Sequence, residues 1–357
     1  MRTIINNKLT RGKHPARPAR SGVDRGRRRS LALVAASSAA LLLPAVGRAA
    51  PSPALRWQGR LLGAPAEVTL YHPERARAAA ALAALAAEVA RLDVVFSLHR
   101  DDSALARLNR AGRLDAAPAA LCELLATCAE LHAASDGAFD PTVQPLWDLY
   151  AAHFAAADAT ADGPSAARLG AILARVGFDF VRRAQASVAF TRAGVALTLN
   201  GIAQGYVTDR ARALLAAHGM PHALVNLGEY AALGPRPDGG PWRVAIAHPE
   251  VPWRMLGVVE LRAGAALATS AGAGTAFDAA RRYHHLLDPR TGRSSASWRS
   301  VSVCAPSATL ADGLSTALAV AAPAQAEAIL ARYPAASALV LDQAGRRRTF
   351  GNGFPLA

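Results

Sequence analysis

The second half of the chain contains short apolar segments separated by only a few turn residues, and this spacing most constrains the fold. The segments read "HALVNLGEYAALG", "WRVAIAHP", "LGVVELRAGAALATSA", "WRSVSVCAP" and "ALVLDQAGRRRTF". Such short connections can join antiparallel strands, whereas parallel strands need a long crossover. Helical periodicity is found between these groups, over residues 74–93, 117–134, 201–219 and 308–320. The sequence therefore predicts an α+β fold with mainly antiparallel sheets and packed helices.

Four further features are expected between residues 66 and 200. Residues 66–71, "AEVTLY", predict a strand, and Ser103 is a candidate N-cap for a short helix. The segment "SVAFTRAGVALTLN", residues 187–200, predicts a hairpin with Gly194 in its turn. Residues 155–164 are small and polar, which indicates a surface insertion.

The net charge of +14 does not indicate a nucleic-acid-binding protein, because most of the basic excess lies in residues 1–50. This segment holds eleven of the 40 Lys and Arg residues and one of the 26 acidic residues, so the remainder carries only +4. Both lysines, Lys8 and Lys13, also lie in this segment. The remainder therefore cannot contain a lysine-dependent phosphate loop or a Schiff-base lysine.

The N-terminal segment has the pattern of a signal peptide. Arg27-Arg28-Arg29 precede a mild apolar stretch, residues 31–46, and a small-residue site suits cleavage after Ala49. The arginine pair predicts a twin-arginine signal over residues 1–49, export to the periplasm, and one functional domain over 50–357. An ordinary secretory signal and an uncleaved anchor are the alternatives. The three cysteines are interpreted as buried small apolar residues rather than as disulfide partners.

Two segments combine residue types that suit an anion or a metal ion. In "LTLNGIAQGYVTDRARALL" a strand leads through a turn with Gly201 and Gly205 into a helix, whose N-terminus favours negative charge. In "SATLADGLSTALAV" Asp312, Ser315 and Thr316 share one helical face, which places a carboxylate beside two hydroxyls as Mg²⁺ prefers. A tight strand–helix junction and a solvated helix start are the structural alternatives.

Two loops are also rich in hydrogen-bonding groups. In "HHLLDPRTG" Pro289 and Gly292 shape a turn, and the preceding His284 and His285 point to opposite sides if the backbone is extended. One of these histidines could then contact a ligand while the other packs. In "SDGAFDPTVQPLW" residues 140–142 can be explained as a capped turn alone.

Taken together and in order, these segments resemble the FAD:protein FMN transferases, also called the ApbE family. The resemblance runs from "RLLGAPAEVTLY" to "FGNGFP" and is carried by "FSLHRDDSALARLN", "GAFDPTVQPLWDLY", "NGIAQGYVTDRA", "NLGEYAALG", "PWRVAIAHP", "ATSAGA", "HHLLDPRTG" and "SVSVCAPSATLADGLSTAL". It implies two intimately associated lobes with a flavin cleft between them. It also implies Mg²⁺-dependent transfer of FMN from FAD, the substrate, to a Thr or Ser hydroxyl of a partner protein, with release of AMP.

The resemblance also implies roles for individual residues. The implied metal site consists of Gly201, Asp312, Ser315 and Thr316. The implied flavin contacts are Leu62, His99, Arg100, Asp101, Ala138, Thr198, Gln204, His285 and Leu287. Asp312 is expected to be essential for catalysis, and the group that takes the acceptor's proton is left open between His285, Asp288 and a metal-bound water.

Three positions depart from the pattern of the family. Thr198 stands where many relatives have an aspartate, Gln204 where many have a lysine, and Glu229 where many have a second glycine. The changes at 198 and 204 remove opposite charges, so we expect the local charge balance to be kept. Two alternative functions stay open: a hydrolase that cleaves FAD to FMN and AMP, and a non-catalytic flavin-binding protein.

The motifs "LNGIAQGY" and "NLGE" also resemble an exported branch of the family that is linked to nitrous-oxide reductase maturation. That branch implies an acceptor flavoprotein that is a membrane electron-transfer subunit.

The signal-peptide prediction can be tested by blocking the twin-arginine pathway. We expect the precursor to accumulate inside the cell, because this route depends on the arginine pair. Detection of a cleaved, exported product by immunoblotting under this block would refute the assignment.

Overall fold

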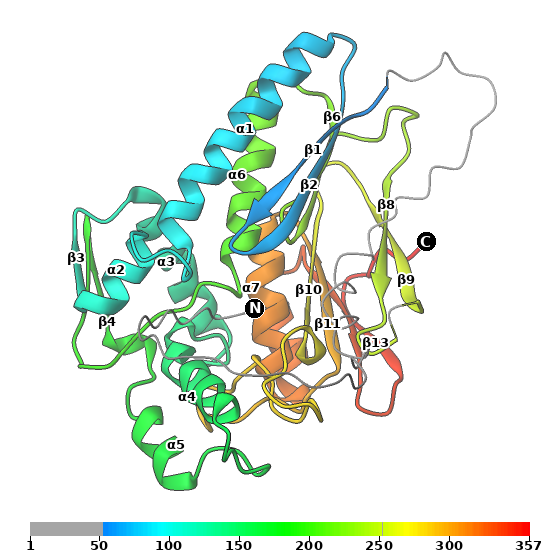
Figure 1. Cartoon of the computed structure of the whole chain (residues 1–357). Coiled ribbons are helices and arrows are strands. Elements are labelled where there is room, and N and C mark those ends of the chain that lie inside the picture. Colours follow the sequence, from blue (N-terminus) through cyan, green and yellow to red (C-terminus); the bar gives the residue numbers. More distant parts are fainter. Residues whose placement is uncertain (1–52, 252) are drawn as a thin grey trace, which may run out of the picture. The chain divides into compact units, whose positions relative to one another are not determined.

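The computed structural model describes residues 53–251 and 253–357, so the predicted signal peptide at 1–49 lies outside the described part. A mixed arrangement of helices and antiparallel sheets confirms the α+β class. The largest sheet has eight strands in the order β1-β2-β6-β7-β10-β11-β12-β13 (Figure 1). Its strands are β1 Leu55–Leu61, β2 Ala64–Tyr71, β6 His222–Asn226, β7 Tyr230–Leu233, β10 Ala266–Ala271, β11 Ser300–Ala305, β12 Ser337–Leu341 and β13 Arg347–Gly351.

Each neighbouring pair of strands in this sheet is antiparallel, as the short connections predict. The large sheet is buried on both faces, which explains why several of its strands are apolar at consecutive positions. In β12, Ala338 and Val340 belong to the core under the helices, whereas Leu339 and Leu341 pack on the opposite face. That opposite face is covered by the hairpin of β8 Trp242–Ala247 and β9 Met255–Leu261. Alternate side chains of one strand therefore serve two different layers.

Helices cover the other face of the sheet, and α6 and α7 stand nearest to its centre (Figure 1). The helices of the described residues are α1 Arg75–Phe96, α2 Ala104–Ala111, α3 Ala119–Ala134, α4 Gln144–Ala155, α5 Ala166–Leu173, α6 Ala203–Ala217, α7 Ala308–Val320 and α8 Ala326–Ala331, with short 3₁₀ turns η1 Pro141–Val143, η2 Phe178–Phe180, η3 Gly272–Gly274 and η4 Pro323–Gln325. The predicted helix over 308–320 is confirmed. Its N-cap is Ser307, whose hydroxyl accepts the N–H of Leu310 at 3.1 Å.

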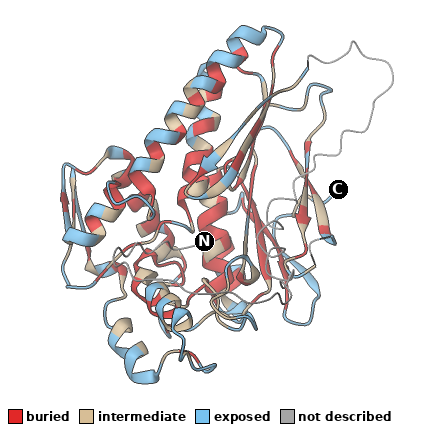
Figure 2. Ribbon diagram, viewed as in Figure 1, coloured by how far each residue is buried: buried red, intermediate tan, exposed pale blue. Residues whose placement is uncertain are grey.

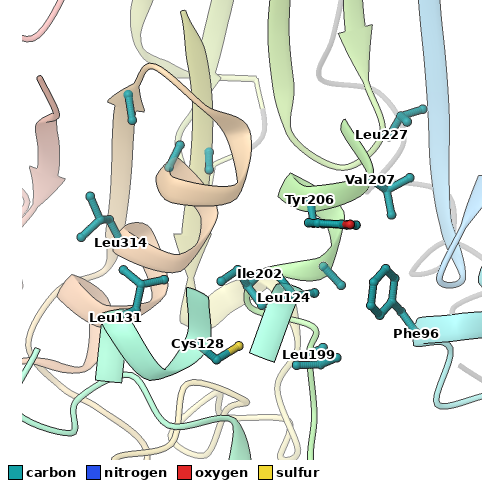
Figure 3. Packing of buried hydrophobic residues seen from close by; sticks show 14 of the residues in the cluster. Phe96, Leu124, Cys128, Leu131, Leu199, Ile202, Tyr206, Val207, Leu227 and Leu314 are labelled. Atoms are coloured by element: carbon teal, nitrogen blue, oxygen red, sulfur yellow. The ribbon is translucent and has the colours of Figure 1, made fainter. Parts of the chain in front are cut away.

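The core between α1, α3, α6 and α7 is made of large aliphatic side chains with one aromatic contact. In Figure 3, Leu131 of α3 and Leu314 of α7 lie near Ile202, which immediately precedes α6. Phe96 and Tyr206 meet edge to face with ring centroids 5.5 Å apart. Figure 2 shows α7 and the inner strands as mainly buried, whereas much of α5 is exposed. Most of α7 is therefore held in the core.

The predicted hairpin over residues 187–200 is wrong. Strand β5 Ser187–Phe190 pairs instead with β3 Arg113–Asp115 and β4 Val181–Ala184 in a separate three-stranded sheet. The backbone of Leu197 is held by the Asn109 side chain, which bonds its N–H and its carbonyl at 2.8 Å each. Hydrogen bonds from a distant side chain replace the ladder that the apolar pattern predicted, so these residues run as an extended loop.

Two helices were not predicted from the sequence, and the three cysteines can be compared with their predicted state. Helices α4 and α5 flank the predicted insertion at 155–164, and neither was predicted as a full helix. Cys122, Cys128 and Cys304 are free thiols; Cys128 and Cys304 are buried as predicted, whereas Cys122 is only partly buried, so the prediction is wrong for that residue. Among the residues that the structure describes, no helix combines the length and apolarity that crossing a bilayer requires. The division into two lobes stays a prediction.

The close crossing of α6 and α7 depends on a glycine. A Cβ atom at Gly205 would lie 2.3 Å from the Ala308 carbonyl oxygen and 2.8 Å from the Asp312 Cβ, so the two helices would have to separate. We expect Gly205→Ala to lower the free energy of unfolding by about 1–3 kcal/mol, because overpacking outweighs the gain in helix propensity.

The matched control is Gly170→Ala in α5, where a Cβ atom would meet nothing within 4 Å. This change should raise the free energy of unfolding by about 0.5–1 kcal/mol in urea denaturation. Equal effects of the two substitutions would contradict the packing argument.

Candidate active site

A cavity of about 330 Å³ opens beside the N-terminal end of α6, one face of α7 and the end of β10. Its volume lies in the range of small-molecule sites. The residues that line it are Ala138, Phe139, Asp140, Pro141, Val143, Trp147, Thr198, Asn200, Gly201, Gln204, Glu229, Thr269, Ser270, Ala271, Gly274, Thr275, His285, Leu286, Leu287, Asp312, Thr316 and Val320. Four of the motifs singled out in the sequence therefore meet at one place.

The turn before α6 and the middle of α7 are in direct contact at this cavity. The Thr316 hydroxyl donates to the Gly201 carbonyl at 3.2 Å, and a Cβ atom at Gly201 would lie 2.8 Å from that hydroxyl. One helical turn earlier, Asp312 accepts the Gly205 N–H at 3.0 Å. A glycine at both positions allows the two segments to approach closely enough to bring a carbonyl, a hydroxyl and a carboxylate together.

Asp312 is almost completely buried, and burial raises the pKa of its carboxyl to about 7. The N–H of Gly205 is the one hydrogen-bond donor that the described residues supply to this carboxylate. A buried carboxylate with so few partners is costly unless a further positive group accompanies it. Its chemistry therefore suits a cation ligand.

Glu229 is a second buried acid at the same cavity. It follows the turn between β6 and β7, and the Thr269 N–H donates to its carboxylate at 3.3 Å. Burial and the nearby Asp312 carboxylate raise the pKa of Glu229 well above its usual value. The sequence identified Glu229 only as a departure from the family pattern and did not predict it to be a site residue.

Hydroxyl groups form the wall behind Asp312. Ser315 is buried and does not line the cavity; its hydroxyl lies 2.7 Å from that of Ser270 and donates to the Asp312 carbonyl at 3.0 Å. Ser270 of β10 does line the cavity and lies 3.4 Å from the Thr316 hydroxyl. Ser270 thus takes the place in the cavity wall that the sequence assigned to Ser315.

The two neighbouring histidines have different surroundings, as the extended approach predicted. His284 packs inward, with its Nε2 3.0 Å from the Ser295 carbonyl, whereas His285 lines the cavity. The Nδ1 of His285 lies 3.1 Å from the Thr275 carbonyl. A carbonyl can only accept, so Nδ1 carries the proton and Nε2 keeps its lone pair. Burial lowers the pKa of His285 to about 4, which keeps the ring neutral at pH 7.

The opposite wall is supported by a capped turn. Asp140 accepts hydrogen bonds from the Thr142 N–H at 2.8 Å and from the Phe178 N–H at 3.0 Å. Pro141 in this turn accepts the Thr198 N–H at 2.8 Å. Residues 140–142 therefore form the capped turn expected from sequence, and they also hold the segment before α6 against the cavity.

Several residues that were predicted to bind the flavin or to act in catalysis lie apart from the cavity. Leu62 is at the turn between β1 and β2, and a Cβ atom at the adjacent Gly63 would lie 3.5 Å from the His99 ring. His99, Arg100 and Asp101 follow α1 and do not line the cavity. Asp288 does not line it either: both carboxylate oxygens accept hydrogen bonds from the Arg290 side chain. The roles of these residues stay predictions.

The donor atoms at the cavity fit a hard cation. The described residues contain no group of three or more His, Cys, Asp and Glu side chains arranged to hold a metal. The donors that meet here are of another kind, namely the Gly201 carbonyl, the Asp312 carboxylate and the Thr316 hydroxyl. Mg²⁺ uses such oxygen atoms and completes its shell with water and substrate phosphates.

Known proteins of one family are similar to this chain in sequence and in structure. The model of the family described as "ApbE family" matches residues 62–340. The FAD:protein FMN transferase of Rhodobacter capsulatus is 32% identical over 318 residues, which are 85% of this chain and 58% of that protein. That of Salmonella typhimurium is 26% identical over 312 residues, or 83% of this chain and 85% of that protein. The apo crystal structure of the Pseudomonas stutzeri flavinyl transferase ApbE has a TM-score of 0.70 at 28% identity, and the match covers 85% of this chain and 97% of that one.

The neutral state of His285 can be tested by titration. NMR of the labelled imidazole should give a midpoint near pH 4, compared with about 6.5 for a free side chain. Since the unfolded chain binds the proton more readily between these values, the free energy of unfolding should fall as the pH is lowered from 6.5 to 4. The fall should be smaller in His285→Asn, and a midpoint near 6.5 would contradict the assignment.

Proposed function

The chain belongs to the ApbE family, and from that premise we propose that it transfers FMN from FAD to a hydroxyl of a partner protein. The acceptor residue is a threonine or serine, and AMP is released. The observation that carries this proposal is the meeting of Gly201, Asp312 and Thr316 at one cavity. These are three of the four residues at which the family resemblance implies a metal site.

The charge of the cavity supports a cation-dependent reaction. Its described lining contains the acids Asp140, Glu229 and Asp312 and the neutral His285, but no arginine or lysine. Such a lining offers a diphosphate no basic side chain to attract it. Gly201, Asp312 and Thr316 would hold Mg²⁺, which neutralises diphosphate oxygens and stabilises the leaving phosphate when it is bound.

The remaining wall suits a large aromatic ligand. Phe139, Val143, Trp147, Leu287 and Val320 give the cavity an apolar part of its lining, beside the polar groups of Asp312 and Thr316. Trp147 is itself held by Phe277, whose ring meets it edge to face at 5.6 Å. An apolar wall facing a few convergent polar groups is the usual composition of a cofactor site. The flavin ring would pack on this side, with its phosphates toward Asp312.

The chemistry requires a base and a leaving group. The acceptor oxygen forms a bond to the phosphorus of the FMN half, the bond from this phosphorus to the bridging oxygen breaks, and AMP leaves with that oxygen. The acceptor's proton must pass to a base. Among the candidates from sequence, His285 lines the cavity and keeps a free ring nitrogen, whereas Asp288 is paired with Arg290. We assign the proton acceptor to His285 on this basis.

We also propose where in the cell the protein acts and which class of protein accepts the FMN. The arginine pair and apolar stretch in residues 1–49 support export to the periplasm by the twin-arginine route. The acceptor would then be an exported or membrane flavoprotein, and a membrane electron-transfer subunit is the class to try first. Comparing covalently flavinylated exported proteins in cells with and without this gene, by mass spectrometry, would identify it.

Removal of the Asp312 charge tests the proposed reaction. The purified protein is incubated with FAD, MgCl₂ and exported proteins from cells that lack this gene. Wild type should give a fluorescent flavin band on a denaturing gel together with AMP. Asp312→Asn should slow both by roughly 100-fold or more, because the variant keeps the shape of the side chain but loses the charge that would hold the cation.

The matched control is Glu260→Gln, which removes a carboxylate of β9 that faces Arg243 rather than the cavity. It should transfer FMN at the wild-type rate. Release of AMP without a labelled band would indicate a hydrolase, and bound FAD without AMP would indicate a non-catalytic flavin-binding protein. Unchanged turnover in Asp312→Asn would remove this residue from the reaction.

A further inference from the structure

We propose that Glu229 is a second acidic partner of the cation that Asp312 would hold, so that two carboxylates bind this cation before FAD arrives. The inference rests on the proposed function and adds a residue to its site. It explains why this chain places a carboxylate at the turn between β6 and β7.

A tight turn holds the Glu229 side chain at the cavity. Gly228 adopts a φ of 110°, which a side-chain-bearing residue rarely does, and a Cβ atom there would lie 2.5 Å from the Gln204 amide carbon. The Glu229 carbonyl accepts the Thr208 hydroxyl at 3.3 Å and the Leu227 N–H at 3.2 Å. The backbone of Glu229 is therefore bonded to α6 and to Leu227, which follows β6, and the residue lines the cavity.

The carboxylate of Glu229 accepts few hydrogen bonds from the protein and reaches the cavity. The residue is 9% exposed, and the Thr269 N–H, at 3.3 Å, is the one donor that the described residues supply to it. Asp312 is 4% exposed and likewise accepts one hydrogen bond. One oxygen of each carboxylate thus accepts no hydrogen bond from the described residues, although both side chains line the cavity. A buried structural carboxylate normally accepts more hydrogen bonds, as Asp140 does.

No positive side chain offsets the two acids. The nearby Asp312 disfavours ionisation of Glu229, and the cavity lining of described residues contains no arginine or lysine. Gln204, which lies over Gly228, is neutral. Two adjacent like charges in a buried site repel each other, whereas a divalent cation between them reverses the sign of the interaction. A cation is the group that makes this pair of acids favourable.

A second carboxylate would change the order in which the cation and FAD bind. Mg²⁺ sites in proteins use one or two carboxylates, and substrate phosphates usually complete the binding. With both Glu229 and Asp312, the free protein should already hold the cation, and the diphosphate of FAD would meet a positive site in an otherwise acidic cavity. This order of binding offers a readout that does not depend on turnover.

The test measures Mn²⁺ binding to the purified protein without FAD, from the electron paramagnetic resonance signal of free Mn²⁺. The variants are Glu229→Gln, Asp312→Asn and the control Glu260→Gln. We expect wild type and Glu260→Gln to bind equally, and each cavity variant to bind at least about tenfold more weakly. Without metal, Glu229→Gln should melt at the same or a higher temperature than wild type, because one of two like charges is gone. Glu229→Ala is the second variant if Glu229→Gln does not fold.

The outcomes separate this inference from the proposed function. Loss of Mn²⁺ binding in Asp312→Asn together with wild-type affinity in Glu229→Gln overturns the role of Glu229 and leaves the proposed function intact. Binding that needs FAD and is equal in wild type and Glu229→Gln also overturns it. No Mn²⁺ binding by wild type, with or without FAD, contradicts both.

Discussion

The geometry of the cavity depends on one contact, the close crossing of α6 and α7. At this crossing the Gly205 N–H donates to the buried Asp312 carboxylate. Glycine at 201 and 205 allows this approach, because a Cβ atom at either position would overlap α7. The same crossing places the Thr316 hydroxyl on the Gly201 carbonyl. A packing requirement of the core therefore creates the cluster of oxygen donors, and the rest of the cavity is arranged around it.

The described lining of the cavity contains acidic side chains but no basic ones. Both lysines of the chain lie in residues 1–50, and the described lining has no arginine. The described lining therefore offers a diphosphate no basic side chain for direct attraction. Its acids are Asp140, Glu229 and Asp312, and the His285 ring is neutral because its surroundings desolvate it and its Nδ1–H donates to the Thr275 carbonyl. This charge is the reason why we propose that a cation accompanies the diphosphate.

Local patterns predicted the elements well, but they did not predict contacts between distant segments. The helical periodicity of residues 308–320 predicts a helix, and the structure has that helix with Ser307 as its N-cap. The hairpin at 187–200 was wrong because Asn109, far away in sequence, satisfies the backbone that a partner strand would have bonded. Gly201, Asp312 and Thr316 were found through the family resemblance, but Glu229 was missed as a site residue. Its burial arises only when the turn after β6 packs near α7, and no local pattern records that approach.

The most direct test of the central claim is the position of the metal. Crystals grown with FAD and Mn²⁺ should show an anomalous scattering peak at the Mn absorption edge, within bonding distance of the Gly201 carbonyl and the Asp312 carboxylate, with the diphosphate of FAD in contact with it. A diphosphate bound in the cavity without such a peak, or a peak at another place in the molecule, would contradict the account.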